Sequence, residues 1–173
     1  MVNYERIVRR IKKSDNIFVM GHKNIDLDSL GTCLAVYDLC DEYNKKCFII
    51  IDDVKFDNGI KKALEFIKAN YRVKIGKSSE FKDKIKKNSL LIIVDTYSEK
   101  RSQAPKLYNI ISNSLFIDHH LFGIPINEDY FIDSKVSSTC EIMAHLFLRR
   151  KMKINKYVAT VMLAGIDIDT NNF

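Results

Sequence analysis

Carboxylate and imidazole side chains follow three short apolar segments of this chain and recur near its end. They are His22, Asp26, Asp28, Asp95, Asp118, His119, His120 and Asp169. Carboxylate oxygens with imidazole nitrogens, and without thiolates, suit manganese, magnesium or iron better than structural zinc. A centre of two such ions activates water for in-line attack on phosphorus. We therefore expect a phosphoester hydrolase with two manganese ions.

The expectation depends on the whole set, because a single aspartate after a strand usually caps a helix or faces water. The number of ligands that two ions need is supplied by His22, Asp26, Asp28, Asp95, His119 and Asp169. His145 has no partners at ligand spacing and is predicted to be ordinary surface. Asp52 and Asp53 end another apolar run, but turn chemistry explains them, and we leave them out of the site.

Alternating apolar and amphipathic segments must position these side chains. Strands are expected at 16–21, 47–51, 90–95 and 115–118, with an edge strand near 131–132. Helices are expected at 3–13, 29–43, 59–69, 105–111 and 155–165. A further helix should follow Ser138, because Glu141 stands at the spacing of a capping box.

This order of elements predicts an α/β fold with a Rossmann-like, mostly parallel β-sheet and helices on both faces. The carboxyl ends of parallel strands meet at one edge of the sheet, and we expect the site there. Asp26 and Asp28 are expected to reach one centre from a loop. The last helix should end near Gly165 and place Asp167 and Asp169 directly after it.

Length and composition fit one soluble domain over residues 1–173. The chain is 46% apolar and 29% charged, and its net charge of +6 favours an anionic partner. No apolar run approaches the ~20 residues of a spanning helix, and no signal peptide is visible, so the expected compartment is the cytosol. The four cysteines form no metal or redox motif, and Cys33 and Cys40 are expected on the buried face of one helix.

Five motifs occur in one order along the sequence. They are Gly21-His22-Lys23-Asn24-Ile25-Asp26-Leu27-Asp28-Ser29-Leu30-Gly31, Val94-Asp95-Thr96, Asp118-His119-His120, Ser137-Ser138-Thr139-Cys140-Glu141 and Gly165-Ile166-Asp167-Ile168-Asp169-Thr170. In these motifs the chain resembles the DHH phosphoesterase superfamily over nearly its whole length. Within it, the chain is most similar to the catalytic lobe of cyclic di-AMP phosphodiesterases of Gram-positive bacteria, which are membrane-anchored multidomain proteins.

The resemblance implies a role for each candidate residue. One manganese would be held by His22, Asp26 and Asp95, and the other by Asp28, Asp95, His119 and Asp169. Asp118 would orient a histidine and His120 would approach the phosphate, which makes these two the catalytic candidates. The substrate contacts would be His120, Ser138 and Thr139.

The sequence departs from the family pattern in four places. Ile25 replaces a frequent proline, Leu121-Phe122 replaces arginines, and Tyr97-Ser98-Glu99 replaces a more basic stretch. The glycine-rich substrate motif of the family's C-terminal lobe is absent from these 173 residues. We therefore expect a cytoplasmic catalytic domain of a larger parent, itself membrane-anchored by resemblance, with weak or no activity alone.

The resemblance leaves the substrate open. The expected substrate is a cyclic dinucleotide or a short oligonucleotide. If it is a cyclic dinucleotide, the expected reaction is hydrolysis of cyclic di-AMP to the linear dinucleotide. Alternatives are an oligoribonuclease that also removes phosphate from adenosine bisphosphate, or a non-catalytic module that binds a nucleotide or partner. Thr96 disfavours a pyrophosphatase. We expect no contact with double-stranded nucleic acid or membrane, and the oligomeric state, a homodimer included, stays open.

Overall fold

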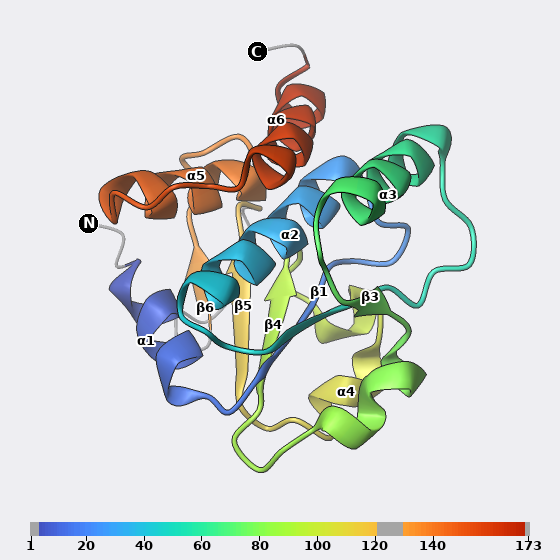
Figure 1. Ribbon diagram of the computed structural model, residues 1–173, viewed down its shortest axis with the longest axis vertical. Coiled ribbons are helices and arrows are strands. Elements are labelled where there is room, and N and C mark those ends of the chain that lie inside the picture. Colours follow the sequence, from blue (N-terminus) through green and yellow to red (C-terminus); the bar gives the residue numbers. More distant parts are fainter. Residues whose placement is uncertain (1–3, 121–129, 172–173) are drawn as a thin grey trace.

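The computed structural model describes residues 4–120 and 130–171 (Figure 1). Its helices are α1 (Glu5–Lys13), α2 (Leu27–Glu42), α3 (Asn58–Asn70), α4 (Pro105–Tyr108), α5 (Thr139–Arg149) and α6 (Lys156–Thr170), with 3-10 turns η1 (Ser78–Lys84) and η2 (Glu99–Arg101). Its strands are β1 (Ile17–Met20), β2 (Cys47–Ile50), β3 (Ile75–Gly76), β4 (Leu90–Val94), β5 (Ser114–Asp118) and β6 (Tyr130–Ile132). The Leu121-Phe122 departure lies outside the described residues.

The described strands form one sheet in the order β3-β2-β1-β4-β5-β6, and every pairing is parallel. Met20 at the end of β1 is level with Ile50 of β2 and Ile93 of β4. The loops that follow these strands therefore leave the sheet at the same edge. This confirms the predicted α/β fold, and the predicted edge strand corresponds to β6.

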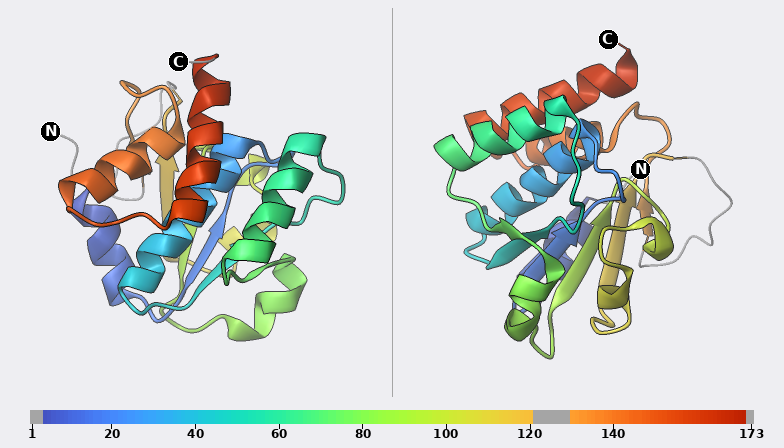
Figure 2. Two further views of the ribbon diagram at one scale, coloured as in Figure 1. Left: turned by 45° about the horizontal axis from the view of Figure 1, so that its top comes forward. Right: turned by 90° about the vertical axis from the view of Figure 1, so that its right-hand side faces the viewer.

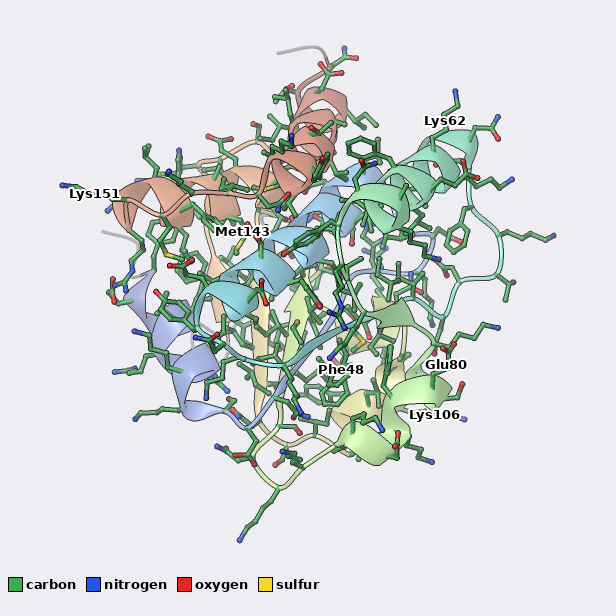
Figure 3. All side chains as sticks on the ribbon, in the orientation of Figure 1. Phe48, Lys62, Glu80, Lys106, Met143 and Lys151 are labelled. Carbon is green, nitrogen blue, oxygen red and sulfur yellow. The ribbon has the colours of Figure 1, made fainter. Side chains whose placement is uncertain are left out.

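The two faces of the sheet are covered unequally. Alternate residues of the strands pack under α1, α2, α3, α5 and α6 in the larger core cluster. The opposite side chains, such as Phe18, Phe48 and Phe116, pack with Leu107 of α4 and Phe81 of η1. Figure 2 shows α6 stacked on α2 on the side away from the strands, and Figure 3 shows Phe48 inside the molecule. Helices on one face thus hold most of the core.

Among the helix boundaries that differ from the prediction, two affect the site. Helix α2 begins at Leu27, because the Asp26 side chain accepts a hydrogen bond from Ser29 N at 2.9 Å and caps the helix. Asp28 therefore lies in the first helical turn and not in a loop. Helix α6 continues through Thr170, so the prediction that Asp169 follows the helix is wrong.

Gly165 explains the second error. A Cβ atom at this position would lie 2.8 Å from the Asp28 Cα atom. Gly165 therefore lies within α6 and lets this helix approach α2 closely. It does not end the helix.

Among the described residues, no helix combines the length and apolarity needed to cross a membrane. The four cysteines are free and buried, which confirms the predicted burial of Cys33 and Cys40.

Candidate metal centre

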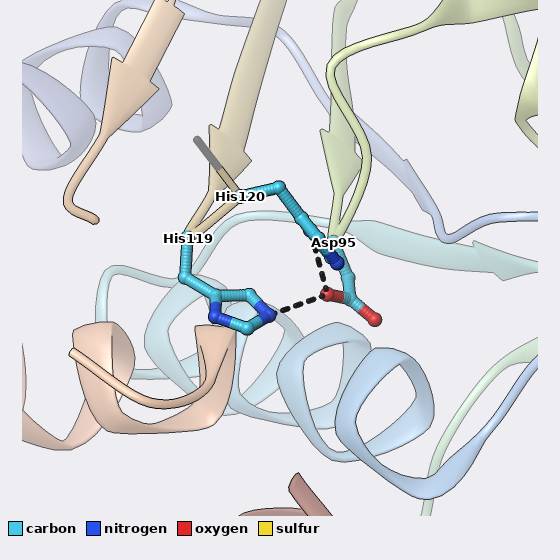
Figure 4. A group of neighbouring side chains, drawn as sticks. All are labelled: Asp95, His119 and His120. Carbon is cyan, nitrogen blue, oxygen red and sulfur yellow. Dashed lines mark ion pairs between the residues drawn. The ribbon is translucent and has the colours of Figure 1, made fainter. Parts of the chain in front are cut away.

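The predicted metal ligands converge at the carboxyl edge of the sheet. Within the described residues, the groups whose ligand atoms lie within 4.8 Å of one another are Asp95-His119-His120, His22-Asp26-Asp95 and Asp28-His119-Asp169. Asp95 follows β4 and takes part in two of these groups. Figure 4 shows His119 and His120 both directed toward its carboxylate. This arrangement fits the sharing of Asp95 between two ions that the family resemblance implies.

The first group joins the loop after β1 to the end of β4. The Nε2 atom of His22 lies 3.2 Å from Asp26 Oδ2 and 3.3 Å from Asp95 Oδ2. Asp95 has a left-handed backbone with φ 57°, which aspartate tolerates better than most residues. The three side chains come from two neighbouring strand ends, as the parallel sheet requires.

The second group joins three distant parts of the chain. His119 Nε2 lies 3.5 Å from Asp169 Oδ2 near the end of α6 and 3.7 Å from Asp95 Oδ1. Asp28 is fully buried, and its two carboxylate oxygens accept hydrogen bonds at 2.8 Å from the backbone N–H groups of Thr139 and Cys140. The first turn of α5 thus fixes the Asp28 carboxylate. Asp167 is in none of the three groups, whereas Asp169 is.

Ser138 and Thr139 lie behind the ligands and not on the cavity wall. Both are fully buried. Ser138 accepts a hydrogen bond from Glu141 N at 3.1 Å and caps α5, while Thr139 Oγ1 donates to Asp95 Oδ1 at 3.0 Å. Glu141 accepts from Ser137 instead of completing the predicted capping box. In the protein alone, Ser138 thus caps α5 and Thr139 contacts Asp95, while their contact with substrate stays a prediction.

Asp118 and His120 form a hydrogen-bonded pair beside the ligands. His120 Nδ1 lies 2.7 Å from Oδ1 of the fully buried Asp118, which also accepts from His119 N at 2.9 Å. The His120 side chain is 47% exposed and lines the cavity. Burial lowers the pKa of His120, but the hydrogen bond to Asp118 outweighs this effect and raises it.

His145, by contrast, is partly exposed on α5, outside the three ligand groups, where its side chain lies beside Glu141.

The electrostatics of the protein alone favour a bound cation. Burial, followed by the nearby Asp28 and Asp26 charges, raises the pKa of Asp95 to about 8 and that of Asp169 to about 6. Burial lowers the pKa of His22, but hydrogen bonds to Asp26 and Asp95 outweigh this and raise it to about 11. In the metal-free protein, bound protons therefore reduce the repulsion between the carboxylates. Divalent cations bound at this centre would reduce it in their place.

These pKa values predict that metal binding strengthens as pH rises. A metal ion must displace the proton of His22 over the whole neutral range and that of Asp95 below about pH 8. Manganese affinity should thus rise on the order of tenfold per pH unit for each displaced proton. Calorimetric titrations at pH 6, 7 and 8, in buffers of different ionisation enthalpy, would measure the released protons. An affinity that does not change with pH would contradict the prediction.

Gln103 supports the first ligand group and was missed by the sequence analysis. This residue is 5% exposed, and its Nε2 donates to His22 O and to Asp53 Oδ2, both at 2.6 Å. Its Oε1 accepts from Asp52 N and Asp53 N at 2.9 Å. Asp53 also accepts from Ile25 N at 2.9 Å, a bond that a proline at this position could not form. No spacing in the sequence links these three segments.

A Gln103→Met variant should lose both stability and metal affinity. The substitution keeps the volume but leaves buried backbone groups of the loops at His22 and Asp53 unpaired, which should cost about 2 kcal/mol in the free energy of unfolding. Manganese affinity of the first ligand group should fall roughly tenfold or more, because outer partners position the ligands. Denaturant unfolding and calorimetric titration measure the two effects. Asp52→Ala is the control, because its side chain bonds to Ser78 and should reduce stability alone.

The ligand groups open into a cavity of about 610 Å³. Besides the ligands it is lined by Lys23, Asn24, Thr96, Tyr97, Lys100 and Arg101. This volume is typical of small-molecule sites.

Comparison with known proteins places the chain in a family. Residues 16–166 match the N-terminal domain of the DHH family. The chain belongs to this family.

Curated relatives support a closer likeness. The chain is 32% identical over 181 residues to a membrane protein–large ribosomal subunit bL9 fusion protein of Onion yellows phytoplasma, covering 99% of this chain and 21% of the relative. It is 30% identical over 170 residues to the cyclic-di-AMP phosphodiesterase GdpP of Bacillus subtilis, covering 94% of this chain and 26% of the relative. The chain thus spans about a quarter or less of the length of these relatives.

A solved structure confirms the fold. An exopolyphosphatase-related protein from Bacteroides fragilis superposes with a TM-score of 0.80 at 22% identity, covering 100% of this chain and 52% of that one.

Proposed function

We propose that this chain is the catalytic domain of a manganese-dependent phosphodiesterase that hydrolyses cyclic di-AMP to the linear dinucleotide. The observation that carries the proposal is the pair of ligand groups His22-Asp26-Asp95 and Asp28-His119-Asp169, joined through contacts of Asp95 with His119. The name of the Bacillus subtilis relative, a cyclic-di-AMP phosphodiesterase, supports the substrate.

The ligand set fits two divalent ions. Hard carboxylate oxygens and imidazole nitrogens surround a centre whose carboxyl pKa values are raised by burial and, after it, by neighbouring carboxylates. Two bound ions would stabilise negative charge on the phosphate and activate the attacking water. The residues of the first group would hold one ion and those of the second the other, with Asp95 between them.

His120 would act on the phosphate directly. Asp118 accepts a hydrogen bond from Nδ1 and keeps the ring in one orientation. The pKa of His120, which the hydrogen bond to Asp118 raises against the effect of burial, favours the form that carries a proton on both ring nitrogens. We propose that the proton on Nε2 stabilises the phosphate oxygens and then passes to the leaving oxygen.

Product analysis tests the proposed substrate. The manganese-loaded chain, and the longer parent if one is isolated, would be incubated with cyclic di-AMP, a short RNA, adenosine bisphosphate and pyrophosphate. We expect cyclic di-AMP to be hydrolysed to the linear dinucleotide in preference to hydrolysis of the other three compounds. Preference for short RNA or adenosine bisphosphate would instead support the oligoribonuclease alternative, and binding without turnover in both proteins would support the non-catalytic module.

A larger context is also part of the proposal. Because relatives are several times longer, we propose that this domain is cytoplasmic in a membrane-anchored parent and works with a second lobe.

A further inference from the structure

The charged or titratable side chains that line the cavity are of two kinds. One kind consists of metal-ligand candidates and His120, described above. The other includes three cationic side chains, those of Lys23, Lys100 and Arg101. Lys100 and Arg101 lie outside the sequence motifs, since the segment after Asp95-Thr96 begins with Tyr97-Ser98-Glu99 and its basic residues come only afterwards.

Lys100 and Arg101 have no ion-pair partner within the part of the chain that the structure describes. Both residues are exposed. Two divalent ions would balance the four carboxylates of the ligand groups. The cavity of the loaded protein would then carry a net positive charge from these cations, which attracts anions.

Hydrogen bonds hold the turn that carries Lys100 and Arg101 beside the first ligand group. Lys23 N donates to Arg101 O at 2.7 Å, and Lys23 Nζ donates to Lys100 O at 3.0 Å. His22 and the fully buried Ser102 form an antiparallel bridge. Turn η2 is therefore fixed to the loop that carries a predicted metal ligand, so the backbone from which the Lys100 and Arg101 side chains extend is held beside the centre.

We propose that Lys100 and Arg101, assisted by Lys23, form a second anion subsite that binds a substrate phosphate group other than the one being hydrolysed. The proposal rests on the proposed function and narrows it. The subsite would favour nucleotides that carry two phosphate groups over those that carry one. The cavity volume of about 610 Å³ has room for more than a single phosphate.

Paired dinucleotide probes test this subsite. ApA contains one bridging phosphate, and pApA contains the same bridge with an additional 5′-phosphate. Both would be titrated into the manganese-loaded chain in the His120→Ala background, which slows turnover. We expect pApA to bind about tenfold more tightly than ApA, since hydrogen bonds to charged groups contribute at this level. The Lys100→Ala/Arg101→Ala variant should lose most of this preference.

A matched variant separates local from general charge effects. Lys61 and Lys62 are exposed on α3 and do not line the cavity, and Figure 3 shows Lys62 at the surface. Lys61→Ala/Lys62→Ala should therefore keep the preference for pApA. Circular dichroism and manganese titration would check that each variant is folded and loaded.

The outcomes distinguish the subsite from the function on which it depends. A preference retained in Lys100→Ala/Arg101→Ala, or lost equally in the α3 variant, overturns the subsite. Equal binding of ApA and pApA by the chain that carries His120→Ala alone also overturns the subsite but leaves the proposed function intact. Binding of neither probe overturns both.

Discussion

Asp95→Asn should abolish tight manganese binding and lower hydrolysis by roughly a thousandfold or more. Asp95 contacts His22 at 3.3 Å and His119 at 3.7 Å, and thus both ligand groups. The amide has nearly the same shape but lacks the charge that holds a cation. Asparagine also tolerates the left-handed backbone at this position, so the substitution tests charge with little added strain. Calorimetric titration and cyclic di-AMP turnover measure the loss.

The same variant should be more thermostable than the parent chain when metal is absent. The raised pKa of Asp95 means that its protonated form stabilises the fold, and this stability is lost as pH rises through about 8. At pH 9 the metal-free parent should therefore melt lower than at pH 6, and Asp95→Asn should melt about 2–4 °C higher than the parent. A variant that melts lower at pH 9 would show that its lost activity reflects damaged folding. Asp83→Asn, in a fully exposed carboxyl, is the control.

His120→Ala should lower kcat by about a hundredfold or more while two manganese ions still bind. The His120 ring contacts Asp118 at 2.7 Å but lies 4.0 Å from Asp95, so its removal leaves the two main ligand groups intact. Because the side chain is 47% exposed, the folded state should lose little stability. Initial rates, manganese titration and melting of the variant measure the three quantities.

His145→Ala provides a matched control for that experiment. Its side chain is 44% exposed on α5, and its ion-pair neighbour is Glu141, away from the cavity. Turnover should be unchanged in this variant. If both histidine variants lost activity equally, His120 would have no special role at the phosphate.

The sequence predicted the sheet well because parallel strands buried on both faces are short, continuous apolar runs. Leu90–Val94 and Ser114–Asp118 are buried throughout, and their ends carry the expected acidic residues. The candidate ligands could be named because their types and order are local features of the chain. That they bind manganese remains a prediction.

Other features depend on contacts between distant segments and could not be predicted. Gly165 has the composition signal of a helix end, but its role is close packing against α2. Gln103 joins loops that lie about eighty and fifty positions earlier in the chain. Thr139 was expected at the substrate. Its motif gives its position in the sequence, but the direction of its hydroxyl toward Asp95 depends on how α5 packs in the fold.

The packing of α6 on α2 also sets the order in which the centre can be completed during synthesis. Domains begin to fold from their N-terminal parts as the chain leaves the ribosome. Asp28 is made early, yet its partner Asp169 is reached only after α6 is made, with Gly165 pressed against the start of α2. A nascent or truncated chain can therefore assemble the sheet and the first ligand group while the second still lacks a carboxylate. The full set of ligands is present only in a chain that has been translated through α6.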